Sequence, residues 1–190
     1  MGLREPRSGG ILWHGKDIQT RLRDWQSRVG YIAKQPFLAS ASLRENVAFG
    51  IASERIDDTQ VESALDRAGF VVDLEVMPQG LWTLIGRGGA RLSAVKRQQI
   101  ALARTLYRDC EVVCFEEIRA TDDSVARPVA ELARLLAPEK TVICVPRRLT
   151  TLRESDRILL LVEGSVIATG TFDELIDSSS VFNELLKSGY

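Results

Sequence analysis

The stretch that decides the fold is Ile85–Leu106, which reads IGRGGARLSAVKRQQIALARTL. A glycine-rich turn precedes Ser93, a residue type that caps the N-terminus of a helix through its hydroxyl. Apolar residues then recur at helical spacing, at Ile100, Ala103 and Leu106, and basic and amide residues fill the other positions. We therefore predict an amphipathic helix that begins after Ser93 and packs through its apolar face.

Composition predicts one globular domain. The 190 residues are 45% hydrophobic and 27% charged, which is ordinary for a chain with one sizeable core. A net charge of -1 gives no electrostatic basis for binding nucleic acid. No apolar run approaches the roughly 20 residues of a membrane-spanning helix. We expect neither a nucleic-acid partner nor a direct membrane span.

Apolar strands alternate with helices along the chain. The predicted strands are 11–13, 29–32, 112–115, 141–145, 157–162 and 166–168, the last two joined in a hairpin. The predicted helices are 43–49, one capped by Asp58 or Thr59, one after Ser93, one through 125–136, one opened by Thr171 and Glu174, and 181–187. Strands that are apolar throughout indicate a parallel sheet covered by helices on both faces, and hence an α/β fold.

Two carboxylates, Glu116 and Glu117, follow the apolar strand 112–115. Many nucleotide hydrolases present a metal ligand and a general base in this way, on acids at the carboxyl end of a hydrophobic strand. One carboxylate holds a water on Mg²⁺ while its neighbour polarises the attacking water. The alternative is a pair of solvated acids at a strand end, and these two residues alone leave both interpretations open.

Further segments, in matching order over nearly the whole chain, resemble the ATP-binding domain of exporter-type ABC transporters. They are SGGILWHGKDI (8–18), VGYIAKQPFLASASLRENVAFG (29–50), MPQGLWTLIGRGG (77–89) and TVICVPRRLTTLRESDRILLLVEGSVIATGTFDELI (141–176). Leu92 and Ser93 match the start of the family's Leu-Ser-Gly-Gly-Gln signature. The resemblance implies a P-loop NTPase-like parallel sheet with a helical subdomain.

The same resemblance implies one partial domain over 1–190. The helical subdomain with the signature region covers roughly 55–107, and 1–54 and 108–190 form the rest of the core. The family's N-terminal Walker A strand, loop and helix are missing, with their expected place upstream of Met1. Family topology puts that strand between the strands 141–145 and 157–162.

The resemblance also assigns catalytic positions. Glu117 matches the family's catalytic Glu, and Glu116 stands at the Walker B Asp position, where it would hold Mg²⁺. Asp123 matches the D-loop Asp. Arg147 stands at the position of the switch His, where it keeps an affinity for phosphate but cannot shuttle a proton.

The positions that contact nucleotide depart from the family pattern. Lys34 stands at the Q-loop Gln position, and a cation there would repel Mg²⁺ in a site of low dielectric constant. After Ser93, the signature positions carry Ala94, Val95 and Lys96. Family glycines let the backbone approach the γ-phosphate held by the partner domain, whereas Ala94 and Val95 add side chains there.

The implied cofactors are ATP and Mg²⁺. The implied partners are the coupling helices of a transmembrane domain and a second ABC domain, in a homo- or heterodimer, at the cytoplasmic face of the membrane. The family hydrolyses ATP, but removing one transition-state donor costs about 10²–10³ in rate, so we predict a degenerate domain with little or no hydrolysis of its own.

Two other interpretations stay open. The chain could be the C-terminal part of an ATP-hydrolysing exporter subunit whose Walker A motif lies upstream or on another chain. It could also be an interaction module that reuses the fold outside transport. The transported substrate is not encoded here, because membrane domains determine that specificity.

Overall fold

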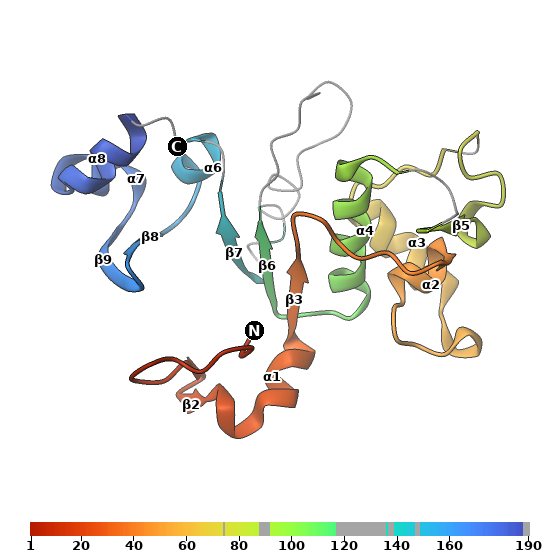
Figure 1. The fold of residues 1–190 in the computed structure, drawn as a ribbon. Coiled ribbons are helices and arrows are strands. Elements are labelled where there is room, and N and C mark those ends of the chain that lie inside the picture. Colours follow the sequence, from red (N-terminus) through yellow and green to blue (C-terminus); the bar gives the residue numbers. More distant parts are fainter. Residues whose placement is uncertain (74, 88–91, 117–135, 137–138, 147–148, 188–190) are drawn as a thin grey trace. The chain divides into compact units, whose positions relative to one another are not determined.

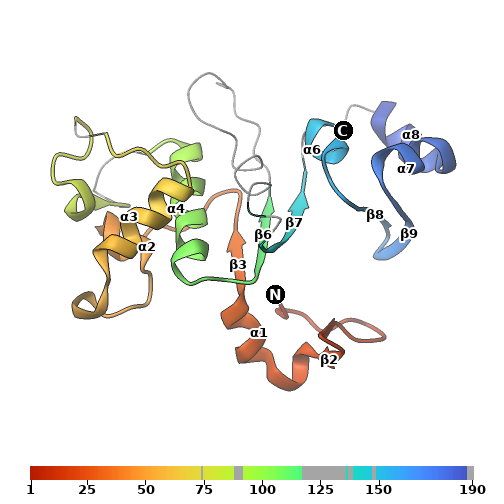
Figure 2. The same ribbon diagram turned by 180° about the vertical axis from the view of Figure 1, so that it is seen from behind.

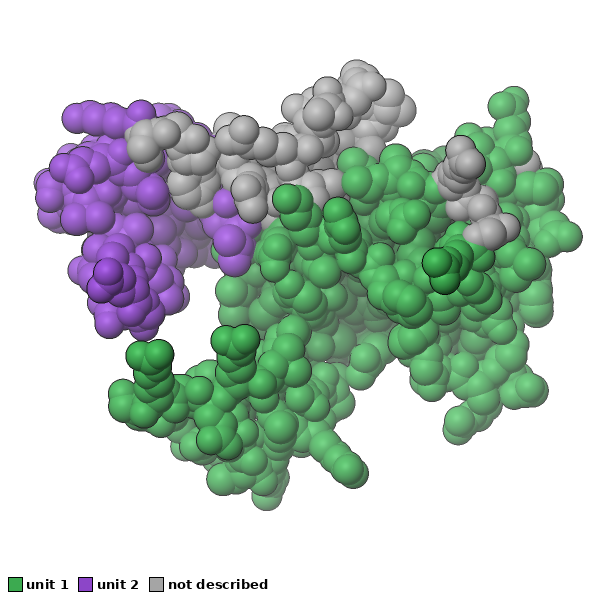
Figure 3. Space-filling view, in the orientation of Figure 1, with its two compact units in different colours: residues 1–116, 120–144 green, residues 117–119, 145–190 purple. Residues whose placement is uncertain are grey.

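The computed structural model describes residues 1–73, 75–87, 92–116, 136, 139–146 and 149–187. The chain divides into two compact units, which are coloured separately in Figure 3. The first unit comprises residues 1–116 and 120–144, and the second comprises residues 117–119 and 145–190. Each unit has a hydrophobic core of its own.

The first unit holds most of the secondary structure. Its described strands are β1 (Leu12–Trp13), β2 (Lys16–Asp17), β3 (Val29–Ile32), β4 (Ala41–Ser42), β5 (Leu84–Ile85), β6 (Val112–Glu116) and β7 (Thr141–Val145). Its described α-helices are α1 (Leu22–Arg28), α2 (Leu43–Val47), α3 (Asp58–Arg67) and α4 (Ala94–Tyr107). β1 pairs with β2, and β4 pairs with β5, both in antiparallel fashion.

The central sheet of this unit has the strand order β3-β6-β7. β3 and β6 are parallel, with Val29 opposite Val112 and Ile32 opposite Phe115. All three arrows point the same way in Figures 1 and 2. Parallel strands need a long crossover connection, and here the chain passes through α2, α3 and α4 between β3 and β6. The predicted parallel sheet is confirmed.

The two faces of this sheet differ in their environment. On one face, Ile32, Val113 and Phe115 are at most 3% exposed and share the main core with residues of α4. On the other face, Tyr31 is 42% exposed and Ile143 is 52% exposed. The second face is open to solvent at these two positions, whereas Val29 and Val112 on the same face are buried. The predicted cover is therefore complete on one face and partial on the other at the described positions.

Helix α4 is the predicted amphipathic helix. Its N-cap is Ser93, whose Oγ accepts a hydrogen bond from the backbone N–H of Lys96 at 3.2 Å. Ile100, Ala103 and Leu106 are all buried. The helix packs on α2, α3 and β3, so it joins the helical region to the sheet.

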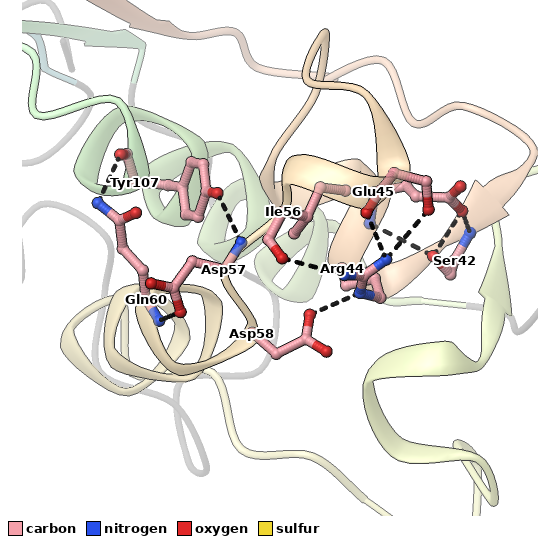
Figure 4. Close-up of polar contacts among 9 residues, drawn as sticks. Ser42, Arg44, Glu45, Ile56, Asp57, Asp58, Gln60 and Tyr107 are labelled. Atoms are coloured by element: carbon pink, nitrogen blue, oxygen red, sulfur yellow. Dashed lines mark hydrogen bonds and ion pairs between the residues drawn. The ribbon is translucent and has the colours of Figure 1, made fainter.

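Buried Arg44 holds α2 against the segment that leads into α3 (Figure 4). Its guanidinium donates to Asp58 Oδ1 at 2.6 Å, to Ser53 Oγ at 3.1 Å and to the Ile56 carbonyl at 3.3 Å. It also lies 4.3 Å from the ring centroid of Trp82. Burying a charge is costly unless it is paired and hydrogen-bonded, and Arg44 meets both conditions.

The N-cap of α3 is Asp57, not the predicted Asp58 or Thr59. Asp57 Oδ1 accepts the backbone N–H of Gln60 at 3.1 Å, and the Tyr107 hydroxyl accepts the backbone N–H of Asp57 at 3.2 Å (Figure 4). The side chain of Gln60 donates to the Tyr107 carbonyl at 3.3 Å. The prediction erred by one residue because Asp58 is engaged by Arg44 and does not cap the helix.

The second unit is a hairpin packed on short helices. It contains α6 (Leu149–Arg153), β8 (Ile158–Val162), β9 (Ser165–Gly170), α7 (Phe172–Ser178) and α8 (Ser180–Lys187). Its core is made by Leu152, Ile158, Leu160, Phe172, Leu175 and Phe182. The intervening positions Leu159 and Leu161 are 57% and 60% exposed. The predicted capping box of Thr171 and Glu174 is confirmed at the start of α7.

Some elements differ from the sequence prediction. Helix α1 was not predicted, because it is short and its two apolar residues, Leu22 and Trp25, are too few to establish a helical period. Helix α6 has only five residues, too few to establish a period. The predicted helix through 125–136 lies outside the described residues except for Leu136. The predicted hairpin of 157–162 with 166–168 is confirmed, since β8 pairs with β9.

Replacing Gly30 with alanine should destabilise the first unit. A Cβ at this position would lie 2.5 Å from Thr105 Cβ on α4 and closer still to the methyl group of Thr105. Overpacking of this kind costs about 1–3 kcal/mol. We therefore expect Gly30→Ala to unfold at a lower urea concentration than the unmodified chain. Gly10→Ala is the control, because its nearest neighbour is the flexible Asp17 carboxylate at 3.2 Å. Equal midpoints for the two variants would contradict this packing.

Candidate functional site

The structure describes only part of the predicted site. Glu117, Asp123 and Arg147 lie outside the described residues, so their roles stay predictions. The described members are Glu116 at the end of β6, Lys34 after β3, and the signature positions 93–96 at the start of α4. β3 and β6 are parallel neighbours, so Glu116, the last residue of β6, and Lys34, two residues after β3, lie at the same carboxyl end of the sheet.

The carboxylate of Glu116 is engaged by a tyrosine. The Tyr31 hydroxyl donates to Glu116 Oε1 at 2.6 Å, across from β3 to β6. This hydrogen bond, with burial as a smaller cause, raises the pKa of Tyr31. The phenol therefore stays protonated at neutral pH and remains a donor to the carboxylate.

Gln98 of α4 joins the ends of the same two strands. Its side chain is 1% exposed, and its Nε2 donates to the carbonyl of Ala33 at 3.2 Å and to that of Glu116 at 3.0 Å. Both hydrogens of the Gln98 amide thus bond to backbone carbonyls at the carboxyl ends of the two strands. Gln98 therefore links the end of β3 to the end of β6.

The described residues do not form a complete Mg²⁺ site by themselves. They contain no cluster of three or more acidic, histidine or cysteine side chains that could hold a metal. Mg²⁺ is usually held by one or two carboxylates together with substrate phosphates and water, and Glu116 is the one described carboxylate at the predicted metal position. The carboxylate of Glu116, at the predicted Walker B position, accepts a hydrogen bond from the Tyr31 hydroxyl. Lys34, at the predicted Q-loop position, adds an exposed ammonium group at the same end of the strands.

The segment 33–37 is held at both ends by α4. Gln98 binds the carbonyl of Ala33, and Arg104 Nη1 binds the carbonyl of Phe37 at 2.7 Å. Arg104 also donates to the carbonyl of Asn46 at 2.5 Å and to Asn46 Oδ1 at 3.0 Å. Burial lowers the pKa of Arg104 to about 10, which leaves the guanidinium charged at neutral pH.

Two exposed aromatic rings flank this segment. Phe37 is 68% exposed and Phe49 is 49% exposed, and their ring centroids lie 6.2 Å apart in an edge-to-face arrangement. Arg104 Cζ lies 5.1 Å from the Phe49 ring. Ile51, 42% exposed, follows two residues after Phe49. We name Phe37, Phe49 and Ile51 the aromatic patch.

The signature lysine is used within the chain. The Lys96 ammonium donates to the carbonyl of Val71 and lies 4.4 Å from the ring centroid of Phe70. Burial lowers the pKa of Lys96. Ala94 and Val95 form the first positions of α4 beside Ser93. The start of the helix is therefore fixed to the 70–71 segment and carries two extra side chains.

One stretch has the spacing of a phosphate-binding loop but a different structure. Residues 10–17, GILWHGKD, match a glycine, four residues, then Gly-Lys, with Asp17 where such loops carry Ser or Thr. Here they form the β1–β2 hairpin, in which Leu12 pairs with Asp17 and Trp13 with Lys16. In a hairpin the backbone N–H groups do not point together at the N-terminus of a helix, so this stretch does not form a phosphate-binding loop.

Sequence reasoning missed three residues of this region: Tyr31, Gln98 and Arg104. Tyr31 lies one strand away from the acid that it contacts, so only the β3–β6 register reveals the pair. Gln98 and Arg104 were read as polar positions of an amphipathic helix. Both lie among buried residues of α4: Gln99 follows Gln98, and Ala103 and Thr105 flank Arg104.

Comparison with known proteins gives consistent matches. Residues 1–120 match the model of the ABC transporter family. The ABC multidrug transporter MDR2 of Trichophyton equinum is 31% identical over 94% of this chain and 14% of that protein. The ATP-dependent lipid A-core flippase of Xanthomonas campestris pv. campestris is 30% identical over 95% of this chain and 31% of the flippase.

A solved structure agrees. A bacterial Atm1-family ABC exporter with ATP bound superposes with a TM-score of 0.79 at 27% identity, over 97% of this chain and 32% of the exporter. The chain thus spans about a third or less of the length of these relatives. No helix in the described ranges is long and apolar enough to cross a bilayer.

Replacing Arg104 with lysine should loosen the segment that carries Phe37. Lysine cannot reproduce the forked hydrogen bonds to Phe37 and Asn46, and buried acceptors left without a donor cost about 1–3 kcal/mol. We expect faster hydrogen exchange at the amide of Ala39, which bonds to Asn46 Oδ1. The amide of Leu43, bonded to the Thr83 carbonyl, is the internal reference.

The matched variant is Arg97→Lys, since Arg97 is exposed and makes a single 3.4 Å contact with the Leu92 carbonyl. It should leave both amides unchanged. If Arg104→Lys also leaves Ala39 protected, the guanidinium does not hold this segment.

Proposed function

The chain belongs to the ABC transporter family, and from that premise we propose that it is an exporter-type nucleotide-binding-domain-like protein that docks on a transmembrane domain and hydrolyses little or no ATP by itself. Its fold is the P-loop NTPase-like α/β fold. This chain spans at most 32% of the length of the relatives named above, so membership of the family does not show that it has their transport activity.

The aromatic patch is the observation that carries the docking proposal. Exposed phenylalanines are costly in water, and Phe37 and Phe49 are nevertheless exposed side by side. Their backbone is not loose, since Arg104 binds the carbonyl of Phe37 and contacts the Phe49 ring. The two rings offer an apolar surface, and the Arg104 guanidinium beside them carries a positive charge. This combination suits the C-terminal end of a partner helix, which presents apolar side chains and free backbone carbonyls.

Two contacts and one exposed cation support the low hydrolytic capacity. Tyr31 engages Glu116, Lys96 engages Val71, and Lys34 places a cation after β3. Each occupies a position that the family uses for metal or nucleotide. The same proposal has three further parts. The chain pairs with a second ABC domain, it lies at the cytoplasmic face of the membrane, and any nucleotide it binds is ATP with Mg²⁺.

ATP turnover tests the first half of the proposal. We expect phosphate release by the purified chain to lie at least about 10²–10³-fold below that of a complete exporter, because even one missing transition-state donor has that effect. Any residual release should be the same in Glu117→Gln, which marks it as background. Turnover within tenfold of a complete exporter, lost in Glu117→Gln, would instead favour a chain that is part of a hydrolysing subunit.

Photo-cross-linking tests the docking half. Phe37→p-benzoylphenylalanine keeps an aromatic ring at the aromatic patch and reacts with whatever covers it. We expect adducts in the source cells with a cytoplasmic loop of a multi-span membrane protein, identified by mass spectrometry. Phe49→Ala should weaken this adduct several-fold.

The matched control is the same photoreactive residue at Val71, which is 73% exposed and outside the aromatic patch. It should give no such adduct. Adducts from position 37 with water-soluble proteins alone would favour the non-transport interaction module.

A further inference from the structure

Strand β8 of the second unit has an outer edge without the features that usually protect such an edge. Among the described strands its one partner is β9, in a two-stranded sheet (Figure 1). Its residues, Ile158–Val162, include no charged residue and no proline. Leu159 and Leu161 are 57% and 60% exposed on the face away from the core of this unit. An exposed apolar edge strand is a template for pairing with another chain.

The other edge of the hairpin, on β9, is interrupted by a bulge. The register passes from Leu160 opposite Ala168 to Leu161 opposite Val166, so Ile167 is an extra residue on β9. A bulge bends its strand and increases the local twist, which hinders the addition of a further strand. β8 carries no extra residue, so its edge is the one that suits strand pairing.

The two ends of β8 carry opposite charges. Arg157 directly precedes the strand and Glu163 directly follows it, and both residues are exposed. In the described part of the chain, neither side chain has a hydrogen-bond or ion-pair partner. An antiparallel copy of the same strand, aligned on Leu160, brings Arg157 near Glu163 of the second copy at both ends. The sequence RILLLVE is therefore complementary to itself in charge and in apolar character.

We propose that β8 pairs antiparallel with β8 of a second copy of this chain and forms a four-stranded sheet in the order β9-β8-β8-β9. Aligned on Leu160, each Leu159 lies beside Leu161 of the second copy, and apolar pairs of this kind stabilise neighbouring strands. A two-fold axis repeats every contact, as in most homodimers. A two-stranded hairpin gains stability when it is extended to more strands.

This contact goes beyond the proposed function and uses different residues. It involves neither the signature positions at the start of α4 nor the aromatic patch. It is also separate from the proposed pairing with a second ABC domain, because its residues all belong to β8 and its two flanking positions.

Sedimentation equilibrium of the whole chain over a concentration series tests the dimer. A pair of five-residue strands is small beside the roughly 1,200–2,000 Å² of a standard interface, so we expect a reversible monomer–dimer equilibrium that favours the dimer only at high concentration. Arg157→Glu and Glu163→Arg each place like charges together at both ends of the paired strands. Each should weaken dimerisation by about tenfold, because two exposed ion pairs are replaced by repulsion.

Mixing the two single variants restores opposite charges at both ends. We expect Arg157→Glu and Glu163→Arg to form a heterodimer about as tightly as the unmodified chain forms its homodimer. Native mass spectrometry distinguishes the heterodimer by its mass. Recovery in the mixture also shows that both variants are folded, so a loss of dimer in either one alone is a loss of the contact.

The matched controls are Arg55→Glu and Glu62→Arg, two exposed positions in the first unit with the same changes of charge. Neither should alter dimerisation, alone or mixed. The proposal is wrong if the unmodified chain stays monomeric at every concentration, if the changes at 157 and 163 leave the dimer as strong as before, or if their mixture forms no heterodimer. A dimer that ignores these two positions would point to another surface.

The outcomes are distinguishable from those of the proposed function. Docking through the aromatic patch is measured by cross-linking from position 37, and ATP turnover is measured by phosphate release. Neither measurement involves β8, so a failed dimer test leaves both standing, and their failure leaves the β8 contact intact.

Discussion

The rest of the first unit depends on two side chains of α4 that bind backbone carbonyls. Gln98 joins the ends of β3 and β6, and Arg104 joins Phe37 to Asn46. Carbonyls without donors are costly when buried, so these contacts tie α4 to the ends of β3 and β6, to the segment 33–37 and to α2. The strand ends, the segment 33–37 and the aromatic patch all take their positions from this one helix.

Much of the fold could be predicted because its signals are local. Ser93 and the Thr171–Glu174 pair cap helices through contacts within four residues, and β3 is an apolar run that needs no partner to be recognised. α1 gave no such signal, since it is short and has only two apolar residues. The cap of α3 was misplaced by one residue, because a distant arginine decides which aspartate is available.

The candidate site was harder to predict for a physical reason. Its residues were assigned by resemblance, which fixes positions along the chain but not the contacts between strands. The engagement of Glu116 by Tyr31 depends on the register of β3 against β6, and the engagement of Lys96 depends on where the 70–71 segment lies. The resemblance predicts which positions form the site, and the structure shows which contacts the described ones make.

The contact of Lys96 also bears on how this site could be changed. Its ammonium satisfies the carbonyl of Val71 and covers the Phe70 ring, so the lysine has become part of the packing around the start of α4. A shorter polar residue at this position would lose the contact with the Phe70 ring and leave the Val71 carbonyl to solvent. A change at position 96 that is made to alter ligand contacts therefore also changes the packing around the start of α4.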